Sequence, residues 1–296
     1  MTLKRVGFIG VGQMGLPMAR RVAEAGYPLT VFDVQPENCE RLRAAVPACD
    51  IDVVASADLV AGASTVLLML PSSLEVTDVV RRLLWADSPP RMIIDMSSSI
   101  PAATRELARE CGARECRLID APVSGGAAGA SAGTLTIMVG CPQGDLPLVH
   151  DLLSILGQPR RVGEIGAGHA VKALNNYLSA AAMLATAEAV ALCERMGLDA
   201  AATIETIDQS TGRSWATHHK FPEFVFTERF DSGFSLRLLA KDLGIAKAMA
   251  GDAGLRLTLL GTCAAAWAEA DADMPGSDHT EIASWVSSHA AVAHDG

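Results

Sequence analysis

Aromatic residues are scarce in this 296-residue chain: Phe, Trp and Tyr make up 4% of the sequence, whereas hydrophobic residues make up 50%. The core must therefore be built from Ala, Val, Leu, Ile and Met, a mixture that suits helices packed on a parallel sheet. Because single hydrophobic cores stop growing near about 250–300 residues, we expect two domains.

Runs of basic residues are also missing. The chain has 24 Lys and Arg residues against 34 Asp and Glu residues, which gives a formal net charge of −10. A protein that binds nucleic acid needs clustered positive charge to neutralise phosphates. No nucleic-acid partner is therefore expected.

Cysteine pairs and metal-ligand spacings are absent as well. The seven cysteines are scattered, odd in number and contain no C-x-x-C. This pattern argues against a disulfide framework and a zinc site and favours a reducing compartment. The histidines never pair with carboxylates at ligand spacing, so no metal is expected.

No stretch of about 18 uninterrupted apolar residues occurs. The Ala-rich segment 177–193 is broken by Ser179, Thr186 and Glu188. Near the N-terminus, Val6–Val11 contains two glycines and lacks a small-residue cleavage site, so it is expected to be a strand and not a signal peptide. We therefore expect a cytoplasmic protein without a membrane partner.

The hydrophobic pattern divides the chain into two parts. Up to residue 163, short apolar runs such as Val6–Ile9 alternate with helix-like segments, which predicts an α/β Rossmann-type, doubly wound domain with a parallel sheet. Farther on, long helical patterns such as Ala170–Met196 and Leu236–Ala250 predict an all-α domain. Glycines in Val162–Gly168 mark the boundary, so the predicted domains are 1–163 and 164–296.

A glycine-rich turn follows the first predicted strand. It consists of Gly10, Val11, Gly12, Gln13, Met14 and Gly15. Because a helical pattern, Leu16–Ala25, comes next, the turn lets the backbone approach a pyrophosphate and points free helix N–H groups at it. The second strand, Leu29–Phe32, ends on Asp33, at the spacing of a carboxylate that accepts both ribose hydroxyls. We expect NAD and not NADP, because Asp33 would repel a 2′-phosphate.

Other strand ends are expected to contribute, because ligands of open α/β sheets bind beyond the carboxyl ends of strands. Leu70 and Pro71 would cover the adenosine side, and Ser98 would hydrogen-bond the nicotinamide ribose. The loop residues Ser124, Gly125 and Gly126 would present N–H groups and a hydroxyl to a carboxylate. The alternative interpretation is that these residues belong to ordinary surface loops, in which the same residue types are common.

The first helix of the second part carries a polar stripe. Its members stand at i, i+3, i+4 and i+7 and share one helix face: Lys172, Asn175, Asn176 and Ser179. Burying them on an Ala-rich helix is costly unless they meet polar partners or a ligand. Lys241 repeats the pattern, although a lone lysine is also typical of a surface residue with a solvated charge. Together, these polar residues on apolar helices predict a functional site.

Four segments resemble the signatures of the 3-hydroxyisobutyrate dehydrogenase family of β-hydroxyacid dehydrogenases. In chain order they are Phe8–Ala19, Asp120–Gly126, Gly168–Asn176 and Lys241–Gly244. The resemblance implies a Rossmann domain, a helical domain, a homodimer or homotetramer, and NAD-dependent interconversion of a small 3-hydroxy acid and its semialdehyde.

The resemblance also implies roles for single residues. Lys172 would be the acid/base, and it would need surroundings that lower its pKa, because a lysine with a pKa near about 10.4 is protonated at neutral pH. Lys241 would line the nicotinamide side. The substrate-binding residues would be Ser124, Gly125, Gly126, Asn175, Asn176 and Arg213. Many family members have Ser-Ser-Thr where this chain has Ser97-Ser98-Ser99.

Two rival interpretations stay open. The first is 6-phosphogluconate dehydrogenase, whose catalytic helix also resembles Gly166–Lys172. That enzyme would have a His-Asn pair where this chain has Asn175 and Asn176, and it would have a longer C-terminal region. A non-catalytic NAD-binding family member would be expected to lack Lys172. The substituent on C2 of the substrate is also open, since methyl, hydroxyl, amino and hydrogen all suit the same carboxylate anchor. The alternative substrates are tartronate semialdehyde, serine, threonate and a sulfonate analogue.

Overall fold

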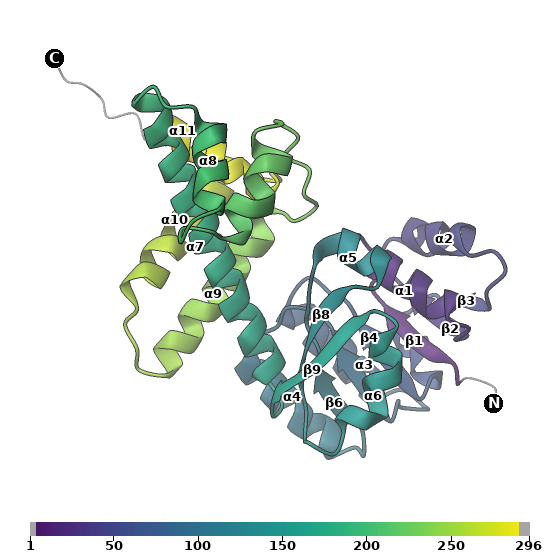
Figure 1. Ribbon diagram of the computed structural model, residues 1–296. Coiled ribbons are helices and arrows are strands. Elements are labelled where there is room, and N and C mark those ends of the chain that lie inside the picture. The colour runs from purple at the N-terminus through teal and green to yellow at the C-terminus, as the bar shows by residue number, and fades with distance from the viewer. Residues whose placement is uncertain (1–3, 290–296) are drawn as a thin grey trace. The chain divides into compact units, whose positions relative to one another are not determined.

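The computed structural model describes residues 4–289 and divides into two compact units, Met1–Lys172 and Ala173–Gly296 (Figure 1). The first three residues of the first predicted domain and the last seven of the second lie outside the described part. The division falls inside helix α7 (Ala167–Arg195) and not at residue 163. One uninterrupted helix leaves the first unit and continues into the second.

The first unit is built on a sheet in which six strands are parallel in the order β3-β2-β1-β4-β5-β6. This is the strand order of the doubly wound dinucleotide-binding fold, as predicted. The six strands are β1 (Val6–Ile9), β2 (Leu29–Phe32), β3 (Ile51–Val53), β4 (Thr65–Leu68), β5 (Met92–Asp95) and β6 (Arg117–Asp120).

Beyond β6 the sheet is no longer purely parallel. β8 (Leu135–Gly140) runs antiparallel to β6 and to β7 (Val123–Ser124), whereas β9 (Gly157–Gly163) is parallel to β8. Between β7 and β8 lies only the short helix α5 (Gly126–Ala132). A parallel crossover needs about a dozen residues or more, so this short connection suits an antiparallel return. The prediction of a parallel sheet is correct only up to β6.

Helices cover both faces of this sheet. Phe8 and Leu67 pack in one hydrophobic cluster, and the next residues along their strands, Ile9 and Leu68, pack in the other. The helices of the first cluster are α1 (Gly15–Glu24), α2 (Pro36–Ala45), α5 (Gly126–Ala132) and α6 (Leu146–Ser154). Those of the second are η1 (Ala57–Gly62), α3 (Ser73–Leu84) and α4 (Pro101–Gly112). Strands buried on both faces explain the short continuous apolar runs of the sequence.

The second unit is helical, and its described residues contain no strand, only one isolated bridge between Ser235 and Asp278. Its core surrounds Trp267, which is fully buried and donates from Nε1 to the Ala180 carbonyl at 3.3 Å. After α7 the elements are α8 (Ala200–Asp208), η2 (Ala216–Val225), α9 (Leu236–Asp252), α10 (Thr258–Asp273), η3 (His279–Glu281) and α11 (Ile282–His289).

Helix α7 is, within residues 4–289, the one helix long and apolar enough to cross a membrane. Ala180, Met183 and Ala187 of this helix are buried in the core of the second unit, as in the central helix of a globular domain. Leu178 and Leu192 of the same helix are exposed. The homo-oligomer stays a prediction.

Candidate active site

The glycine turn between β1 and α1 has the packing that a pyrophosphate site requires. A Cβ on Gly10, which has φ +90°, would lie 2.2 Å from the Met69 carbonyl oxygen, and a Cβ on Gly15 would lie 1.8 Å from that of Gly10. At Gly12 nothing lies within 4 Å of such an atom. Two glycines are therefore needed by the fold, and the middle one leaves open space at the start of α1, where a phosphate fits.

Asp33 lies directly after β2 and faces this turn. Its Oδ2 accepts from the Val11 N–H at 2.8 Å, and its Oδ1 accepts from the Gln35 N–H at 2.9 Å and from Asn38 Nδ2 at 3.2 Å. The partly exposed carboxylate therefore joins the second strand to the glycine turn. A carboxylate has about four lone-pair sites, so acceptor capacity remains for a ribose hydroxyl.

The loops after β4 and β5 are hydrogen-bonded to each other, because the Leu70 N–H donates to Ser97 Oγ at 2.9 Å. Ser97 and Ser99 are buried, while Ser98 between them and Leu70 are partly exposed, and Pro71 is exposed. Alternation along the loop thus leaves Ser98 as the accessible serine. This accessibility is compatible with the predicted cofactor contact, which stays a prediction.

Ser124 ends β7, and Gly125 and Gly126 lead into α5. Ser124 is partly buried, and both glycines are exposed. Gly125 (φ 131°) and Gly126 (φ 63°) adopt positive φ values, which glycine permits without strain. The predicted carboxylate anchor is therefore an accessible loop at a helix start.

The polar stripe of the sequence lies on α7 as predicted, and its centre is buried. Asn176 is 5% exposed; its Oδ1 accepts from Asn175 Nδ2 at 3.1 Å, and its Nδ2 donates to Asp242 Oδ2 at 2.5 Å. The buried Asp242 belongs to α9, and its Oδ1 lies 3.3 Å from Lys241 Nζ. Lys172, one turn before Asn175, is partly buried.

Asp242 is a site residue that sequence reasoning missed. The sequence offered one indication of Asp242, because this residue follows Lys241 in the fourth signature segment. Its contact with Asn176, which lies 66 residues earlier in the chain, is formed only in the folded protein. The carboxylate fixes the orientation of the Asn176 amide.

Replacing Asp242 by alanine is expected to lower the free energy of unfolding by about 1–3 kcal/mol, because Asn176 Nδ2 would stay buried without an acceptor. Urea unfolding monitored by circular dichroism measures this loss. Glu269→Ala, at an exposed position on α10, is the matched control. Equal stabilities of the two variants would show that the Asn176–Asp242 contact contributes nothing.

Arg213, which the family resemblance assigns to substrate binding, lies in the loop between α8 and η2. Its Nε is 3.7 Å from Asp208 Oδ1, and its Nη2 is 3.3 Å from His218 Nδ1. The hydrogen bond from His218, followed by that from Thr217, holds the pKa of Asp208 below its ordinary value. Arg213 is therefore engaged in an exposed ionic cluster, and its contact with a substrate stays a prediction.

Three buried groups that the sequence did not single out meet beside the carboxyl ends of β5 and β6. Asp95, Asp120 and His169 are each at most 1% exposed. In the sequence, such residues can be found as charged or titratable side chains next to apolar residues; Asp120, for example, follows Leu118 and Ile119. Across residues 4–289 no cluster of three or more His, Cys, Asp or Glu side chains is arranged to hold a metal ion.

Comparisons with known protein families agree with this arrangement. Residues 5–166 match the NAD-binding domain of 6-phosphogluconate dehydrogenase, and residues 166–286 match the NAD-binding domain of NADP-dependent 3-hydroxyisobutyrate dehydrogenase. The junction of the two matches coincides with the start of α7.

Individual relatives point the same way. The human mitochondrial 3-hydroxyisobutyrate dehydrogenase is 36% identical over 252 residues, which cover 82% of this chain and 74% of the human protein. A Pseudomonas aeruginosa NAD-dependent L-serine dehydrogenase is 36% identical over 255 residues, covering 83% and 85%.

A solved structure supports the fold over nearly the whole chain. The Mycobacterium tuberculosis 3-hydroxyisobutyrate dehydrogenase with L-serine has a TM-score of 0.88 and 31% identity, and the match covers 96% of this chain and 99% of that one. Sequence signatures, domain matches and fold thus agree. The chain belongs to the 3-hydroxyisobutyrate dehydrogenase family of NAD-dependent β-hydroxyacid dehydrogenases.

Proposed function

We propose that this protein interconverts a small 3-hydroxy acid and its semialdehyde with NAD, and that Lys172 transfers the proton. The observation that carries the proposal is the polar face of α7, where Lys172 precedes by one turn an asparagine amide that Asp242 holds in place. The names of the relatives, which include 3-hydroxyisobutyrate and L-serine dehydrogenases, support a substrate with a hydroxyl on C3.

In the proposed oxidation, Lys172 Nζ takes the proton of the substrate hydroxyl, and the carbon–oxygen single bond becomes a carbonyl. Bound NAD supplies the hydride acceptor. Asn176, whose amide is oriented by Asp242, binds the substrate, and the loop Ser124–Gly126 holds its carboxylate. In the reverse direction the protonated Lys172 gives its proton to the new alkoxide.

A substrate panel tests the proposal. Purified protein is assayed with NAD and 3-hydroxyisobutyrate, 3-hydroxypropionate, L-serine, glycerate, threonate and a sulfonate analogue of the 3-hydroxy acid. Tartronate semialdehyde is assayed with NADH in the reducing direction. We expect the highest kcat/KM for a 3-hydroxy acid, because carboxylate anchor and hydroxyl must both be engaged. Lactate, a 2-hydroxy acid, is the matched control. Turnover of lactate as fast as that of every 3-hydroxy acid, or of none of these compounds, would refute the proposal.

A further inference from the structure

The first turn of α7 contains a histidine that is buried against charged groups. His169 is 1% exposed, its Nε2 lies 3.5 Å from Asp95 Oδ2, and its Nδ1 lies 2.8 Å from Thr104 Oγ1. Thr104 Oγ1 also lies 3.1 Å from the Ile100 carbonyl oxygen, so its hydroxyl joins the histidine ring to the first turn of α4. The ring is thus fixed at one nitrogen by α4 and directs the other toward a carboxylate of β5.

Asp120, at the end of β6, binds the backbone of the same turn. Its Oδ1 accepts from the Gly166 N–H at 2.7 Å and its Oδ2 from the His169 N–H at 3.0 Å. The first N–H groups of a helix have no partner inside the helix, and a carboxylate there also interacts favourably with the helix dipole. A strand residue 46 positions earlier therefore caps α7.

The Asp120 carboxylate is packed closely against the backbone of Gly168, where there is no room for a side chain. A Cβ on Gly168 would lie 2.8 Å from Asp120 Oδ2 and 2.2 Å from the Met138 carbonyl oxygen. Burial raises the pKa of Asp120, while the charge of His169 and the two backbone hydrogen bonds act in the opposite direction. The contacts with α7 therefore offset the effect of burial on this carboxylate only in part, and its pKa stays above the ordinary value.

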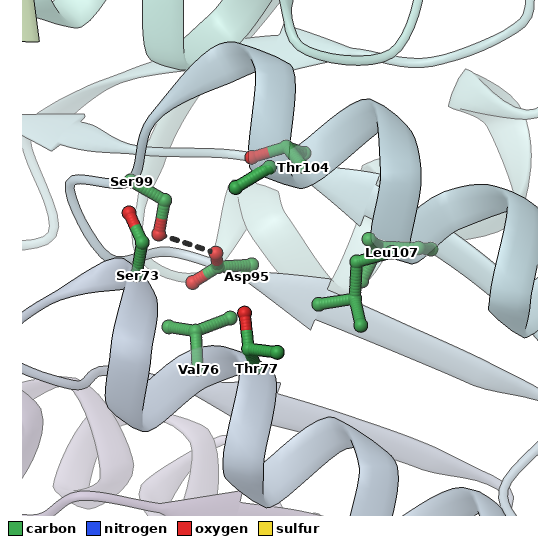
Figure 2. A pocket seen from close by; sticks show the side chains of 9 residues that line it. Ser73, Val76, Thr77, Asp95, Ser99, Thr104 and Leu107 are labelled. Carbon is green, nitrogen blue, oxygen red and sulfur yellow. Dashed lines mark hydrogen bonds between the residues drawn. The ribbon is translucent and has the colours of Figure 1, made fainter.

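Asp95 extends the network toward the cofactor loops. Its Oδ1 accepts from the Ser97 N–H and its Oδ2 from Ser99 Oγ, both at 3.0 Å, and Figure 2 shows the latter bond beside side chains of α3 and α4. The pocket drawn there is too narrow for a water molecule. Because the Leu70 N–H also donates to Ser97 Oγ, a buried hydrogen-bond network joins the loops after β4 and β5. Its Asp95 carboxylate comes within 3.5 Å of His169 Nε2 at the start of α7, without a hydrogen bond between the two.

We propose that His169 and Asp120 are positioning residues for Lys172: they fix the first turn of α7 to the ends of β5 and β6. Lys172 follows His169 by three residues, so a shift or rotation of that turn would move the lysine directly. The inference rests on the proposed function of Lys172. A misplacement of about 1 Å in an active site can cost about 100-fold in rate.

Three variants test the inference by kinetics. His169→Leu removes both ring nitrogens, Asp120→Asn removes the charge and one acceptor oxygen, and His169→Gln restores a polar group that can donate to Thr104. We expect kcat to fall at least about tenfold in the first two, with partial recovery in His169→Gln and a Kd for NAD within about twofold of wild type. A general structural defect would change kcat and NAD binding together and would not be relieved by glutamine.

Exposed residues of α6 provide matched controls, His150→Leu and Asp151→Asn, which should leave kcat unchanged. Hydrogen exchange gives a readout that needs no substrate. In Asp120→Asn the amides of Gly166 and His169 should exchange at least about tenfold faster, while amides of α9 keep their wild-type rates. If His169→Leu fails to fold, Asp120→Asn decides the question.

The outcomes separate the two proposals. If the wild type turns over no substrate of the panel, the proposed function is wrong, and the exchange rates alone decide whether Asp120 anchors α7. If the wild type is active and Lys172→Ala is not, but Asp120→Asn keeps wild-type kcat and exchange rates, the positioning inference is wrong.

Discussion

Lys172→Ala is expected to lower kcat by about 10²–10⁴-fold, the usual contribution of a positioned acid/base group, while NAD affinity stays nearly constant. The physical reason is that the lysine lies on α7, whereas the open glycine turn for the phosphates lies at the start of α1. Steady-state kinetics with the best substrate of the panel gives kcat, and fluorescence titration with NAD gives Kd.

Lys172→Arg should fail as well, because a guanidinium keeps its proton at any accessible pH. For the oxidation, kcat/KM of the wild type should rise toward alkaline pH as the lysine loses its proton, and this limb should be missing in Lys172→Ala. Lys247→Ala, at an exposed position on α9, is the control and should behave as the wild type. Retention of more than about a tenth of kcat by Lys172→Ala would assign the lysine a binding or structural role.

Much of the fold was predictable, because the signals are local. The continuous apolar runs of β1 and β2 and the glycine turn between β1 and α1 are encoded within a few residues each. The return of β8 was harder to see, since β7 has only two residues and periodicity cannot register so short a strand. The boundary is a similar case: a glycine cluster suggested a linker, but α7 begins inside it and continues.

In the candidate site, too, the residues that lie close together in the sequence were predictable and their tertiary partners were not. Lys172, Asn175 and Asn176 could be grouped from helical spacing alone, because they lie on one helix. Their partners could not, since Asp242 approaches Asn176, and Asp120 approaches His169, only through tertiary structure. A charged residue within an apolar run does indicate that a partner exists, because burying an unpaired charge would cost too much free energy. It does not say which residue the partner is.

Asp33→Asn is expected to reduce the preference for NAD over NADP by roughly tenfold or more. Two unit charges about 5 Å apart interact by about 3 kcal/mol at an effective dielectric constant near 20, and solvent at the partly exposed Asp33 weakens this repulsion of a 2′-phosphate. Asparagine removes the charge at unchanged volume, so the preference should fall mainly through faster use of NADP. The measurement is kcat/KM for both cofactors with one substrate.

The hydrogen bonds of Asp33 make a second variant informative. Alanine removes the charge and also the acceptor for the Val11 N–H, so Asp33→Ala should loosen the glycine turn and lower kcat/KM with both cofactors, whereas Asp33→Asn keeps one acceptor oxygen. Asp52→Asn, an exposed carboxylate on β3, controls for a general change in charge. If the wild type uses NADP as well as NAD, or if Asp33→Asn and Asp52→Asn have the same cofactor ratio, then Asp33 organises the turn without selecting the cofactor.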